Sequence, residues 1–530
     1  MIMDVRKSLF WADQIARKII AEQGDKKNYT CASGITPSGV VHIGNFREII
    51  TTHLVVKALQ DLGKKVRFIY SWDDFDRFRK IPKNLPDQEG FKKYLMMPLS
   101  DVPDPWGCHE SYARHFESEI EETMPVLGIR PEYIRQSEMY GKCIYANHIK
   151  EALEYRRTII DILNRYRKKN LLSEEWWPVR IYCENCRKDE TKVMDWDGGY
   201  ILSYTCSCGF KGDTDFSKTG NVKLVWRVDW PMRWYYEGVD FEPAGKDHST
   251  PGGSRDTANE IVKAVWKRKP PTHLMYDFII IKSGGKMSGS EGNVVKVSEV
   301  LDVYIPEIVR FLFAGTKPRK EFTISFDEEV IKIYEDFYYT ERVFYGSEKV
   351  QEKLKNHLVR VYEMSCVDEP EKNMPAQPGF KHCVELINIF RAPEKALERV
   401  KEMEKLNKKD LDRYFAVLSR AKAWLERYAP EKYRFELKEK PEDRIVNTLD
   451  DKEKTALKEL MKKLEEKDYT PDELFTIFYE ICEDVSIEPK RFFRAVYLVL
   501  LGKEYGPRLA PFIISTGQKK IAEILKHIQF

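Results

Sequence analysis

The apolar positions near the start of the chain change their spacing in the order strand, helix, strand. Residues 29–33 form a short apolar run before a glycine and proline turn, and residues 44–62 carry apolar side chains at helical spacing. Residues 66–71 form a second apolar run, which ends in an acidic turn. This order predicts a βαβ unit, and its right-handed crossover implies a parallel sheet with a ligand crevice at the carboxyl ends of the strands.

The pattern loosens over residues 81–222, where prolines interrupt it and a helical stretch at 148–169 precedes a cluster of cysteines. Apolar runs return from residue 223, with a helix expected through 258–266 and a strand over 275–281. Beyond residue 327 nearly all apolar positions have helical spacing. The sequence therefore predicts an α/β fold, in which a Rossmann-like parallel-sheet domain is split by an insertion and followed by an all-α domain.

A chain of 530 residues is long enough for several domains. We expect the nucleotide-binding domain in two halves with an insertion between them, then a loop with a connecting helical region, and a helical C-terminal domain. In chain order these segments are residues 1–80 (first half), 81–222 (insertion), 223–285 (second half), 286–345 (loop and connecting region) and 346–530 (C-terminal domain).

Composition narrows the class of protein only a little. The 88 Lys and Arg residues nearly balance 85 Asp and Glu, so any contact with nucleic acid depends on a local basic face. No apolar run approaches the ~20 residues of a membrane span. Residues 1–23 are charged throughout, unlike a signal peptide. We expect a cytoplasmic protein without a membrane partner.

The first candidate site is the start of the predicted helix, where residues 41–45 read VHIGN. Helix N-terminal amides favour an anion, and the side chains of His42 and Asn45 can contact phosphate oxygens. Gly44 lets a nucleotide approach the backbone. A histidine that only caps its helix is the plain alternative.

The second candidate site is residues 286–290, KMSGS, which follow an apolar strand and a glycine-rich turn. The Lys286 ammonium suits the charge that develops on departing pyrophosphate, and the Ser288 and Ser290 hydroxyls add donors. A solvated surface loop is the alternative.

Six stretches in this order resemble class I lysyl-tRNA synthetases, and they extend over essentially the whole chain: residues 36–39, 41–45, 71–76, 229–234, 245–248 and 286–290. The chain departs from the class pattern at Asn45, where a second histidine is usual, and at Gly289, where a lysine is usual. Both departures concentrate phosphate binding on His42 and Lys286.

The resemblance implies activation of lysine by ATP with Mg²⁺, followed by transfer to the 3′-terminal ribose of tRNA(Lys), with the tRNA acceptor stem in contact with the insertion at residues 81–222. Neither step requires a nucleophilic side chain, because the substrate carboxylate attacks phosphorus. We expect a monomer. A glutamyl- or glutaminyl-type synthetase and a zinc-ribbon protein that binds or modifies tRNA are the alternatives. The residues implied in ATP binding are Ser33, Gly34, Thr36, His42, Gly44, Asn45, Asp247, His248 and Lys286.

The acidic turn favours lysine as the amino acid. Asp73, Asp74 and Asp76 follow a strand beside the expected site, and an ammonium group requires a carboxylate, whereas a glutamate substrate would require an arginine. A solvated acidic loop is the alternative. The aliphatic stem of lysine is expected against Trp230, Tyr235 and His248, although ordinary core packing also accounts for such aromatic residues.

Two groups of residues have the composition of metal sites. Cys183, Cys186, Cys206 and Cys208 have zinc-ribbon spacing, which predicts a structural Zn²⁺ site with four thiolates rather than four unliganded buried cysteines. The second group has no standard spacing, and loop polarity explains it nearly as well; Asp101 is its substitute ligand. Its members are Asp104, Cys108, His109 and His115.

If the resemblance holds, the helical C-terminal region binds the tRNA anticodon. Single-stranded bases stack on aromatic side chains while Arg and Lys bind phosphates. One predicted helix carries both kinds of residue, and helix packing is the alternative for each of them: Arg491, Phe492, Arg494 and Tyr497.

Overall fold

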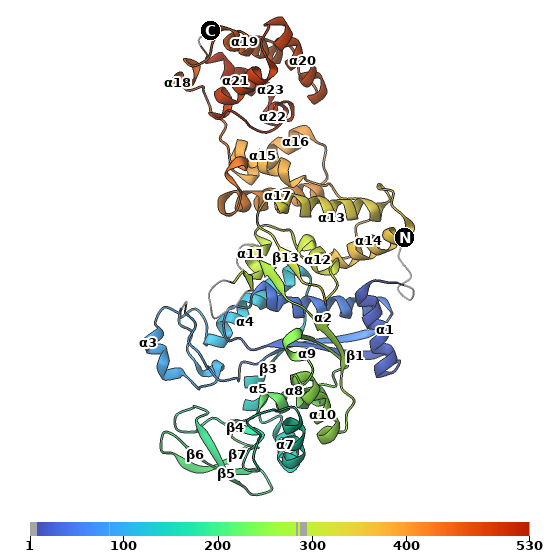
Figure 1. Cartoon of the computed structure of the whole chain (residues 1–530), viewed down its shortest axis with the longest axis vertical. Coiled ribbons are helices and arrows are strands. Elements are labelled where there is room, and N and C mark those ends of the chain that lie inside the picture. Colours follow the sequence, from blue (N-terminus) through green and yellow to red (C-terminus); the bar gives the residue numbers. More distant parts are fainter. Residues whose placement is uncertain (1–7, 84, 282–284, 287–293, 529–530) are drawn as a thin grey trace. The chain divides into compact units, whose positions relative to one another are not determined.

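The computed structural model describes residues 8–83, 85–281, 285–286 and 294–528 (Figure 1). It divides into two compact units. As far as they are described, the first unit contains Met1–Leu301, Pro306–Ile324 and Thr340–Pro370, and the second contains Asp302–Ile305, Ser325–Tyr339 and Glu371–Phe530. Among the helices of this described part, none is long and apolar enough to cross a membrane.

A five-stranded parallel sheet organises the first unit, in the order β10-β9-β1-β2-β3. Burial is greatest in β9, where four consecutive residues are buried, and falls at the edge strand β3, where one of four residues is buried. The predicted βαβ unit is confirmed, because β1 and β2 pair in register along their full lengths. The strands are β1 (Asn28–Ile35), β2 (Lys65–Trp72), β3 (Glu132–Arg135), β9 (Phe241–Gly245) and β10 (Thr272–Tyr276).

Helices cover both faces of this sheet (Figure 1). α1 (Trp11–Gln23) and α2 (Ile43–Asp61) pack together on one face. On the other face, α8 (Trp226–Tyr236) and α10 (Ser254–Trp266) share one hydrophobic core with side chains of four sheet strands. This layering leaves the carboxyl ends of the strands accessible, as the sequence predicts.

The expected strand over residues 275–281 is two strands in two different sheets. β10 ends at Tyr276, and β11 (Ile279–Ile281) belongs to a small sheet with β12 (Gly285–Lys286) and β13 (Phe322–Ile324). The chain breaks at Asp277, whose carboxylate accepts the backbone N–H of Phe278 and a hydrogen bond from Lys246. The single-strand prediction was wrong because an apolar run does not record which sheet each half joins.

The expected insertion, residues 81–222, also needs correction, because β3 lies within it and forms an edge of the main sheet. The rest of the range is built from short helices and two small antiparallel sheets. The strands are β4 (Val179–Ile181) paired with β8 (Val222–Leu224), and β5 (Thr191–Trp196), β6 (Ile201–Cys206) and β7 (Lys211–Asp215). The helices are α3 (Gln88–Phe91), α4 (Tyr112–Thr123), α5 (Gln136–Gly141), α6 (Ala146–Glu154) and α7 (Arg156–Arg165).

The remaining helices of the first unit are α9 (Lys246–Ser249), α11 (Val297–Leu301), α12 (Pro306–Ala314) and α14 (Glu352–Ser365), and α13 (Glu329–Tyr345) runs from the second unit into the first. The Arg360 guanidinium, 4% exposed as a side chain, joins α14 to α1 through Asp13 and to α2 through Asp61. The helical C-terminal unit therefore begins later than the expected residue 346.

Apart from the start of α13, the second unit is helical from α15 onward, as predicted, and a core of apolar side chains holds its last helices together. Several helices begin with side-chain caps, among them the capping boxes of Asp450 with Glu453 and of Thr470 with Glu473. The helices are α15 (Phe380–Phe390), α16 (Pro393–Met403), α17 (Lys408–Arg427), α18 (Asp443–Val446), α19 (Asp451–Glu466), α20 (Pro471–Asp484), α21 (Pro489–Leu501), α22 (Leu509–Thr516) and α23 (Gln518–Lys526).

Candidate functional site

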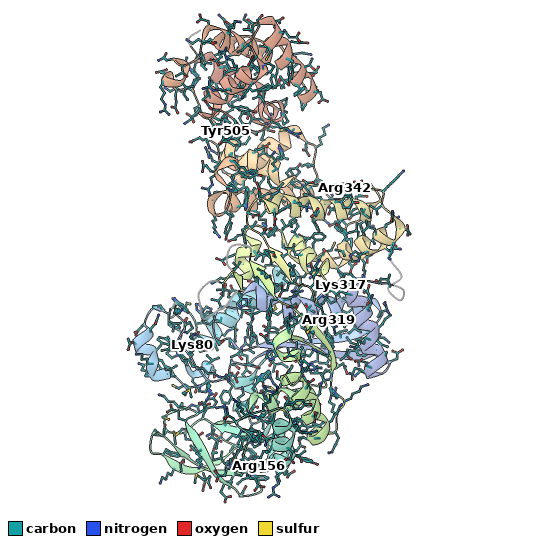
Figure 2. All side chains as sticks on the ribbon, viewed as in Figure 1. Lys80, Arg156, Lys317, Arg319, Arg342 and Tyr505 are labelled. Carbon is teal, nitrogen blue, oxygen red and sulfur yellow. The ribbon has the colours of Figure 1, made fainter. Side chains whose placement is uncertain are left out.

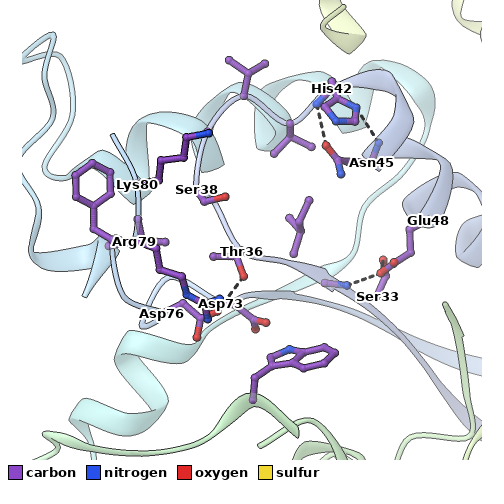
Figure 3. A pocket seen from close by; sticks show the side chains of 18 of the residues that line it. Ser33, Thr36, Ser38, His42, Asn45, Glu48, Asp73, Asp76, Arg79 and Lys80 are labelled. Atoms are coloured by element: carbon purple, nitrogen blue, oxygen red, sulfur yellow. Dashed lines mark hydrogen bonds between the residues drawn. The ribbon is translucent and has the colours of Figure 1, made fainter. Parts of the chain in front are cut away.

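A cleft of about 690 Å³ opens at the carboxyl ends of β1 and β2, beside the start of α2 (Figure 3). Gly34 permits the close approach of these two strands, because a Cβ atom there would lie 2.7 Å from the carbonyl oxygen of Ser71. The lining includes most of the residues expected to bind ATP: Ser33, Gly34, Thr36, His42, Asn45 and His248. Asp247 is exposed on α9 and does not line the cleft.

His42 caps the helix that carries it. Its Nδ1 atom accepts the backbone N–H groups of Gly44 and Asn45 at 3.0 and 3.3 Å, while Asn45 Oδ1 accepts the His42 N–H at 3.3 Å. Since Nδ1 is an acceptor, the neutral imidazole carries its proton on Nε2. Capping and phosphate binding are therefore compatible, because the cap fixes the tautomer that leaves Nε2–H as a donor.

Burial lowers the pKa of His42 to about 4, so the imidazole is neutral near pH 7. The Asn45 carboxamide keeps its NH₂ group available, because only its oxygen takes part in the cap. The helix start thus presents uncharged N–H donors to the cleft, which suits an anionic ligand together with the helix dipole.

The second signature is described only in part. Lys286 lies in β12 opposite Ile280 of β11, whereas Ser288 and Ser290 lie outside the described residues. The chain that follows returns to the first signature, because His42 forms a β-bridge with Lys296 and the Ile43 N–H donates to the Val295 carbonyl at 2.9 Å. The described residues on the two sides of this signature therefore lie in β12 and beside His42.

Two of the three aspartates in the acidic turn line the cleft, and both are already paired with buried cations. Asp73 accepts hydrogen bonds from Arg233 at 2.6 and 3.3 Å. Asp76 forms an ion pair with Lys223 at 2.5 Å, and the Thr36 hydroxyl also donates to it. Burial raises the pKa of Asp76, but Lys223 more than offsets this, so the pKa is lowered overall.

Asp74 lies away from the cleft. The Ser137 N–H and hydroxyl both donate to its carboxylate, and burial raises its pKa to about 6. Its hydrogen bonds hold the segment after β2 against α5. The expectation that Asp74 contacts a ligand is therefore wrong, because its carboxylate points to Ser137.

A narrow inner pocket of about 80 Å³ adjoins the cleft. Trp226 and Trp230, stacked with centroids 5.2 Å apart, form part of its wall. The carboxylates of Glu48 and Glu242 also line it. Tyr235 does not, because its side chain is 39% exposed and its ring contacts His148 and Trp266 instead.

Glu48 is the carboxylate that sequence reasoning missed. It accepts hydrogen bonds from the Ser33 hydroxyl (3.0 Å), the Gly34 N–H (3.1 Å) and the Tyr276 hydroxyl (2.6 Å), and it forms no ion pair with any described residue. Burial raises its pKa to about 7, and the nearby Glu242 charge adds to the rise. Its sequence signal is its position six residues after His42, on the helix that begins at the first candidate site.

Glu242 behaves similarly at the back of the inner pocket. Its oxygens accept the indole N–H groups of Trp230, at 3.0 Å, and Trp234. Burial raises its pKa, and within the described part of the chain it has no ion-pair partner. The inner pocket also contains the paired Arg233 and Asp73. Beside this pair it combines indole walls with two carboxylates that accept hydrogen bonds only from neutral donors, an arrangement suited to a cation on an aliphatic stem.

The four predicted cysteines converge in one cluster. Their sulfur atoms lie within 4.8 Å of one another, with Cys183 to Cys208 at 3.8 Å and Cys186 to Cys206 at 3.6 Å. Sulfurs around a tetrahedral zinc ion lie about 3.8 Å apart, given Zn–S bonds of about 2.3 Å. The Phe210 N–H lowers the pKa of the Cys208 thiol to about 6, which favours the thiolate. The cluster could hold a metal ion.

The second group also converges. The Cys108 sulfur lies 3.2 Å from an Asp104 oxygen and 3.1 and 3.3 Å from Nδ1 of His109 and His115. All four ligand atoms lie within 4.8 Å of one another. The expected substitute ligand, Asp101, is instead paired with Arg187 at 2.7 Å.

The residues expected to bind the anticodon divide into two kinds. Phe492 and Tyr497 are 0% and 9% exposed and belong to the helical core, so neither ring offers a face to a base. That part of the expectation was wrong, because both residues continue the apolar stripe of α21. Arg491 and Arg494 are partly exposed and pair with acidic neighbours, Asp450 and Glu504.

Comparison with known families gives two matches along the chain. A family model described as tRNA synthetases class I (K) matches residues 9–368. A second model, described as an anticodon binding domain, matches residues 394–528. Together they account for both units.

Individual proteins match over the whole length. The lysine–tRNA ligase of Borreliella burgdorferi is 45% identical over 98% of this chain and 99% of its own length, and that of Pyrococcus horikoshii is 42% identical over 97% and 99%. Among solved structures, a glutamate tRNA ligase from Elizabethkingia meningosepticum is similar, with a TM-score of 0.45 and 14% identity over 95% of this chain and 99% of that one.

Proposed function

The chain belongs to the class I (K) family of tRNA synthetases, and from this membership and the cleft we propose that it is a lysine–tRNA ligase. It activates L-lysine with ATP and then transfers the lysyl group to the 3′-terminal ribose of tRNA(Lys). The observation that carries the choice of amino acid is the inner pocket, where Glu48 and Glu242 line an indole wall without a paired cation.

In the first step, a carboxylate oxygen of lysine attacks the α-phosphorus of ATP, and the bond from that phosphorus to the pyrophosphate oxygen breaks. His42 Nε2–H and the Asn45 amide donate to phosphate oxygens from the start of α2. Lys286 stabilises the departing pyrophosphate, and Ser288 and Ser290 are proposed donors beside it. Mg²⁺ that accompanies ATP would neutralise part of the phosphate charge.

In the second step, a hydroxyl of the terminal ribose attacks the lysyl carbonyl carbon and loses its proton, and the bond from that carbon to the AMP oxygen breaks. Catalysis in both steps comes from positioning and charge stabilisation.

Lys286→Ala should therefore slow adenylate formation more than it weakens lysine binding, and equal losses would argue against a role in the transition state.

Lysine binds with its ammonium group at Glu48 and its aliphatic stem against Trp226 and Trp230. An ammonium ion favours the charged form of a buried carboxylate, which burial alone disfavours. Glu242 extends the negative potential at the back of the pocket. Asp73 and Asp76 contribute by holding Arg233 and Lys223, and hence the shape of the cleft.

Zn²⁺ is the proposed ion of the cysteine cluster, where four thiolates leave no open coordination position and the role is structural. A second Zn²⁺ is proposed at Asp104, Cys108, His109 and His115. Metal analysis of the purified protein should find at least one zinc per chain. Cys183→Ser should lose it, whereas Cys482→Ser, a buried cysteine outside both clusters, should keep it.

The decisive experiment is ATP–pyrophosphate exchange with each amino acid, with and without tRNA, followed by charging of tRNA(Lys). Lysine alone should support both reactions. Activity with glutamate or glutamine instead would favour a glutamyl- or glutaminyl-type synthetase. No activity with any amino acid would favour a zinc-ribbon protein that binds or modifies tRNA. The 42–45% identity to lysine–tRNA ligases over nearly the whole chain argues against both of these alternatives.

The helical unit is proposed to bind the anticodon, with Arg491 and Arg494 as phosphate contacts. Action as a monomer and a cytoplasmic location stay predictions that follow from the same reasoning.

A further inference from the structure

Arg47 lies on α2, one turn beyond the capped start of the helix, and it is 1% exposed. It does not line the cleft, and the reaction steps described above do not use it. Within the described part of the chain its hydrogen-bond acceptors are backbone carbonyl oxygens, and none is a carboxylate. A fully buried arginine without an acidic partner is unusual, because burial of an unpaired charge is costly.

The carbonyl groups that accept these hydrogen bonds come from two segments. The Nη1 group donates to the Phe278 carbonyl at 2.8 Å. The Nη2 group donates to the carbonyls of Pro318 at 2.7 Å and Lys320 at 2.6 Å, with that of Lys317 farther away at 3.4 Å. Lys317 and Arg319, both labelled in Figure 2, lie in this second segment. A planar fork of donors reaches both segments at once, whereas an ammonium group is a single point of contact.

Each segment leads into a strand of the small sheet. Phe278 immediately precedes β11, and Lys320 precedes β13 by two residues. β11 and β13 pair in parallel, beginning with Ile279 opposite Phe322. The Arg47 guanidinium also lies 5.1 Å from the centre of the Phe322 ring. Arg47 therefore holds the starts of two neighbouring strands against α2.

The remaining strand of this sheet, β12, carries part of the second signature. It runs antiparallel to β11, with Lys286 opposite Ile280. Beyond the signature, the Ile43 N–H donates to the Val295 carbonyl at 2.9 Å. The first turns of α2 therefore contact the described chain on both sides of the signature, through Arg47 before it and through Ile43 after it.

The charge of Arg47 strengthens this attachment. Burial lowers its pKa to about 10, and the nearby Asp277 charge opposes the shift, so the guanidinium is charged at pH 7. Hydrogen bonds from a charged donor are stronger than those between neutral groups. An apolar side chain at this position would remove them from the starts of both strands at once.

We propose that Arg47 is a positioning residue for adenylate formation, and that it fixes the sheet that carries Lys286 relative to the helix that carries His42. Because Arg47 does not line the cleft, it acts through these other residues. Without its fork of donors, the strand that carries Lys286 would lose its fixed position relative to the phosphate-binding start of α2. This inference rests on the proposed function, because it acts through the role proposed there for Lys286.

The test is a double-mutant cycle on the full-length protein, measured by lysine-dependent ATP–pyrophosphate exchange in the presence of tRNA(Lys). Arg47→Met, an apolar side chain of similar length, should lower kcat about 100-fold and leave KM for lysine within about twofold, since the loss falls on the transition state. In the Lys286→Ala background, Arg47→Met should lower kcat by less than about threefold. Losses that do not multiply indicate that the two residues act as one unit.

The matched control is Arg310→Met. Arg310 on α12 is 0% exposed, and burial lowers its pKa to about 10 as well. Its acceptors are also backbone carbonyls, those of Leu127, Met364 and Ser365 at 2.8, 2.9 and 3.2 Å, and none belongs to the small sheet. Arg310→Met should therefore lower the free energy of unfolding about as much as Arg47→Met. Any change that it causes in kcat should be the same factor in the wild-type and Lys286→Ala backgrounds.

Arg47→Lys provides the same cycle if Arg47→Met does not fold. It keeps the charge but not the fork, so it reaches the start of one strand only and should lower kcat about tenfold. In the Lys286→Ala background this loss should again fall below about threefold.

An equal loss of kcat from Arg47→Met in both backgrounds would overturn the proposal, because Arg47 would then act on the fold and not through Lys286. An unchanged kcat of Arg47→Met in the otherwise wild-type protein would overturn it as well. Failure of the proposed function is distinguishable, because the wild-type protein itself would then show no lysine-dependent exchange.

Discussion

The acidic turn after β2 and the first turns of α2 both place carboxylates in the same cleft. The carboxylates of the acidic turn are paired with cations, whereas the carboxylate of α2 accepts hydrogen bonds from neutral groups only. Asp73 and Asp76 are each paired with a buried cation, Arg233 and Lys223. Glu48 accepts only neutral donors, and the pKa of its carboxyl is raised to about 7. Proximity to a cleft therefore does not by itself identify a carboxylate that binds a ligand.

The difference teaches how to separate structural from ligand-binding acids. A buried ion pair fixes both of its members, and removing one leaves an uncompensated charge. A buried carboxylate without a cation gains free energy when a cationic ligand arrives. Substitution of a paired aspartate should therefore change the free energy of unfolding more than lysine affinity. Substitution of Glu48 should change lysine affinity more than the free energy of unfolding.

The largest expected effect comes from breaking the Asp73–Arg233 pair, whose side chains are 8% and 10% exposed. Asp73→Asn should lower the free energy of unfolding by about 3 kcal/mol, because it removes the hydrogen-bonded partner of the buried Arg233 guanidinium and leaves Asp229 as its remaining carboxylate. Denaturant unfolding measures this loss. Asp25→Asn, which removes an exposed partner of Lys64, should cost less than about 1 kcal/mol. If Asp73→Asn kept its stability but lost lysine affinity, Asp73 would be a ligand-binding carboxylate rather than a structural one.

Glu48→Gln should reduce kcat/KM for lysine about 100-fold, since a charge-assisted contact to the ammonium is replaced by a neutral one. Its free energy of unfolding should fall by no more than about 1 kcal/mol, because glutamine can still accept hydrogen bonds. Lysine-dependent pyrophosphate exchange in the presence of tRNA measures the first quantity. If Asp76→Asn lowered kcat/KM more than Glu48→Gln without unfolding the protein, Glu48 would not be the main partner of lysine.

Lysine affinity should depend on pH through the Glu48 carboxyl. With its pKa raised to about 7, the group is protonated below that pH in the free protein and must lose its proton to bind an ammonium ion. Affinity should therefore fall by up to about tenfold per pH unit below 7 and level off above it. Calorimetric titrations with lysine at several pH values measure the slope.

Other carboxyls near this site also have raised pKa values, among them Asp74, Asp229 and Glu242. Asp74 does not line the cleft, so its protonation near pH 6 should change the stability of the protein rather than its affinity for lysine. Glu48→Gln should flatten most of the pH profile. A profile that survived this substitution would assign the titration to Glu242 instead.

The smallest expected effect concerns the phosphate end of the cleft. Asn45→Ala should raise KM for ATP about fivefold, the loss of one neutral hydrogen bond. Asn45→Asp keeps the oxygen that caps the His42 N–H but replaces the amide donor with a negative charge, so it should raise KM further. Equal values for the two variants would mean that Asn45 acts only as a cap.

Local patterns predicted much of this molecule from the sequence. The βαβ unit, the helical C-terminal unit and the convergence of four cysteines all follow from spacing along a short segment. Glu48 could not be found in this way, because the Tyr276 hydroxyl that covers it comes from a strand more than 200 residues later. Phe492 and Tyr497 could have been assigned to the core, since they share helical spacing with Val496 and Leu500.

The order of strands in the main sheet has a consequence for synthesis. β1 is central in the finished sheet, yet its second neighbour, β9, begins at Phe241, which pairs with Cys31. At about 5–20 residues per second a ribosome takes about 10–40 s to make the intervening chain. During that interval one edge of β1 lacks its strand partner, so the nascent chain requires protection from pairing with other strands before residues 241–245 emerge.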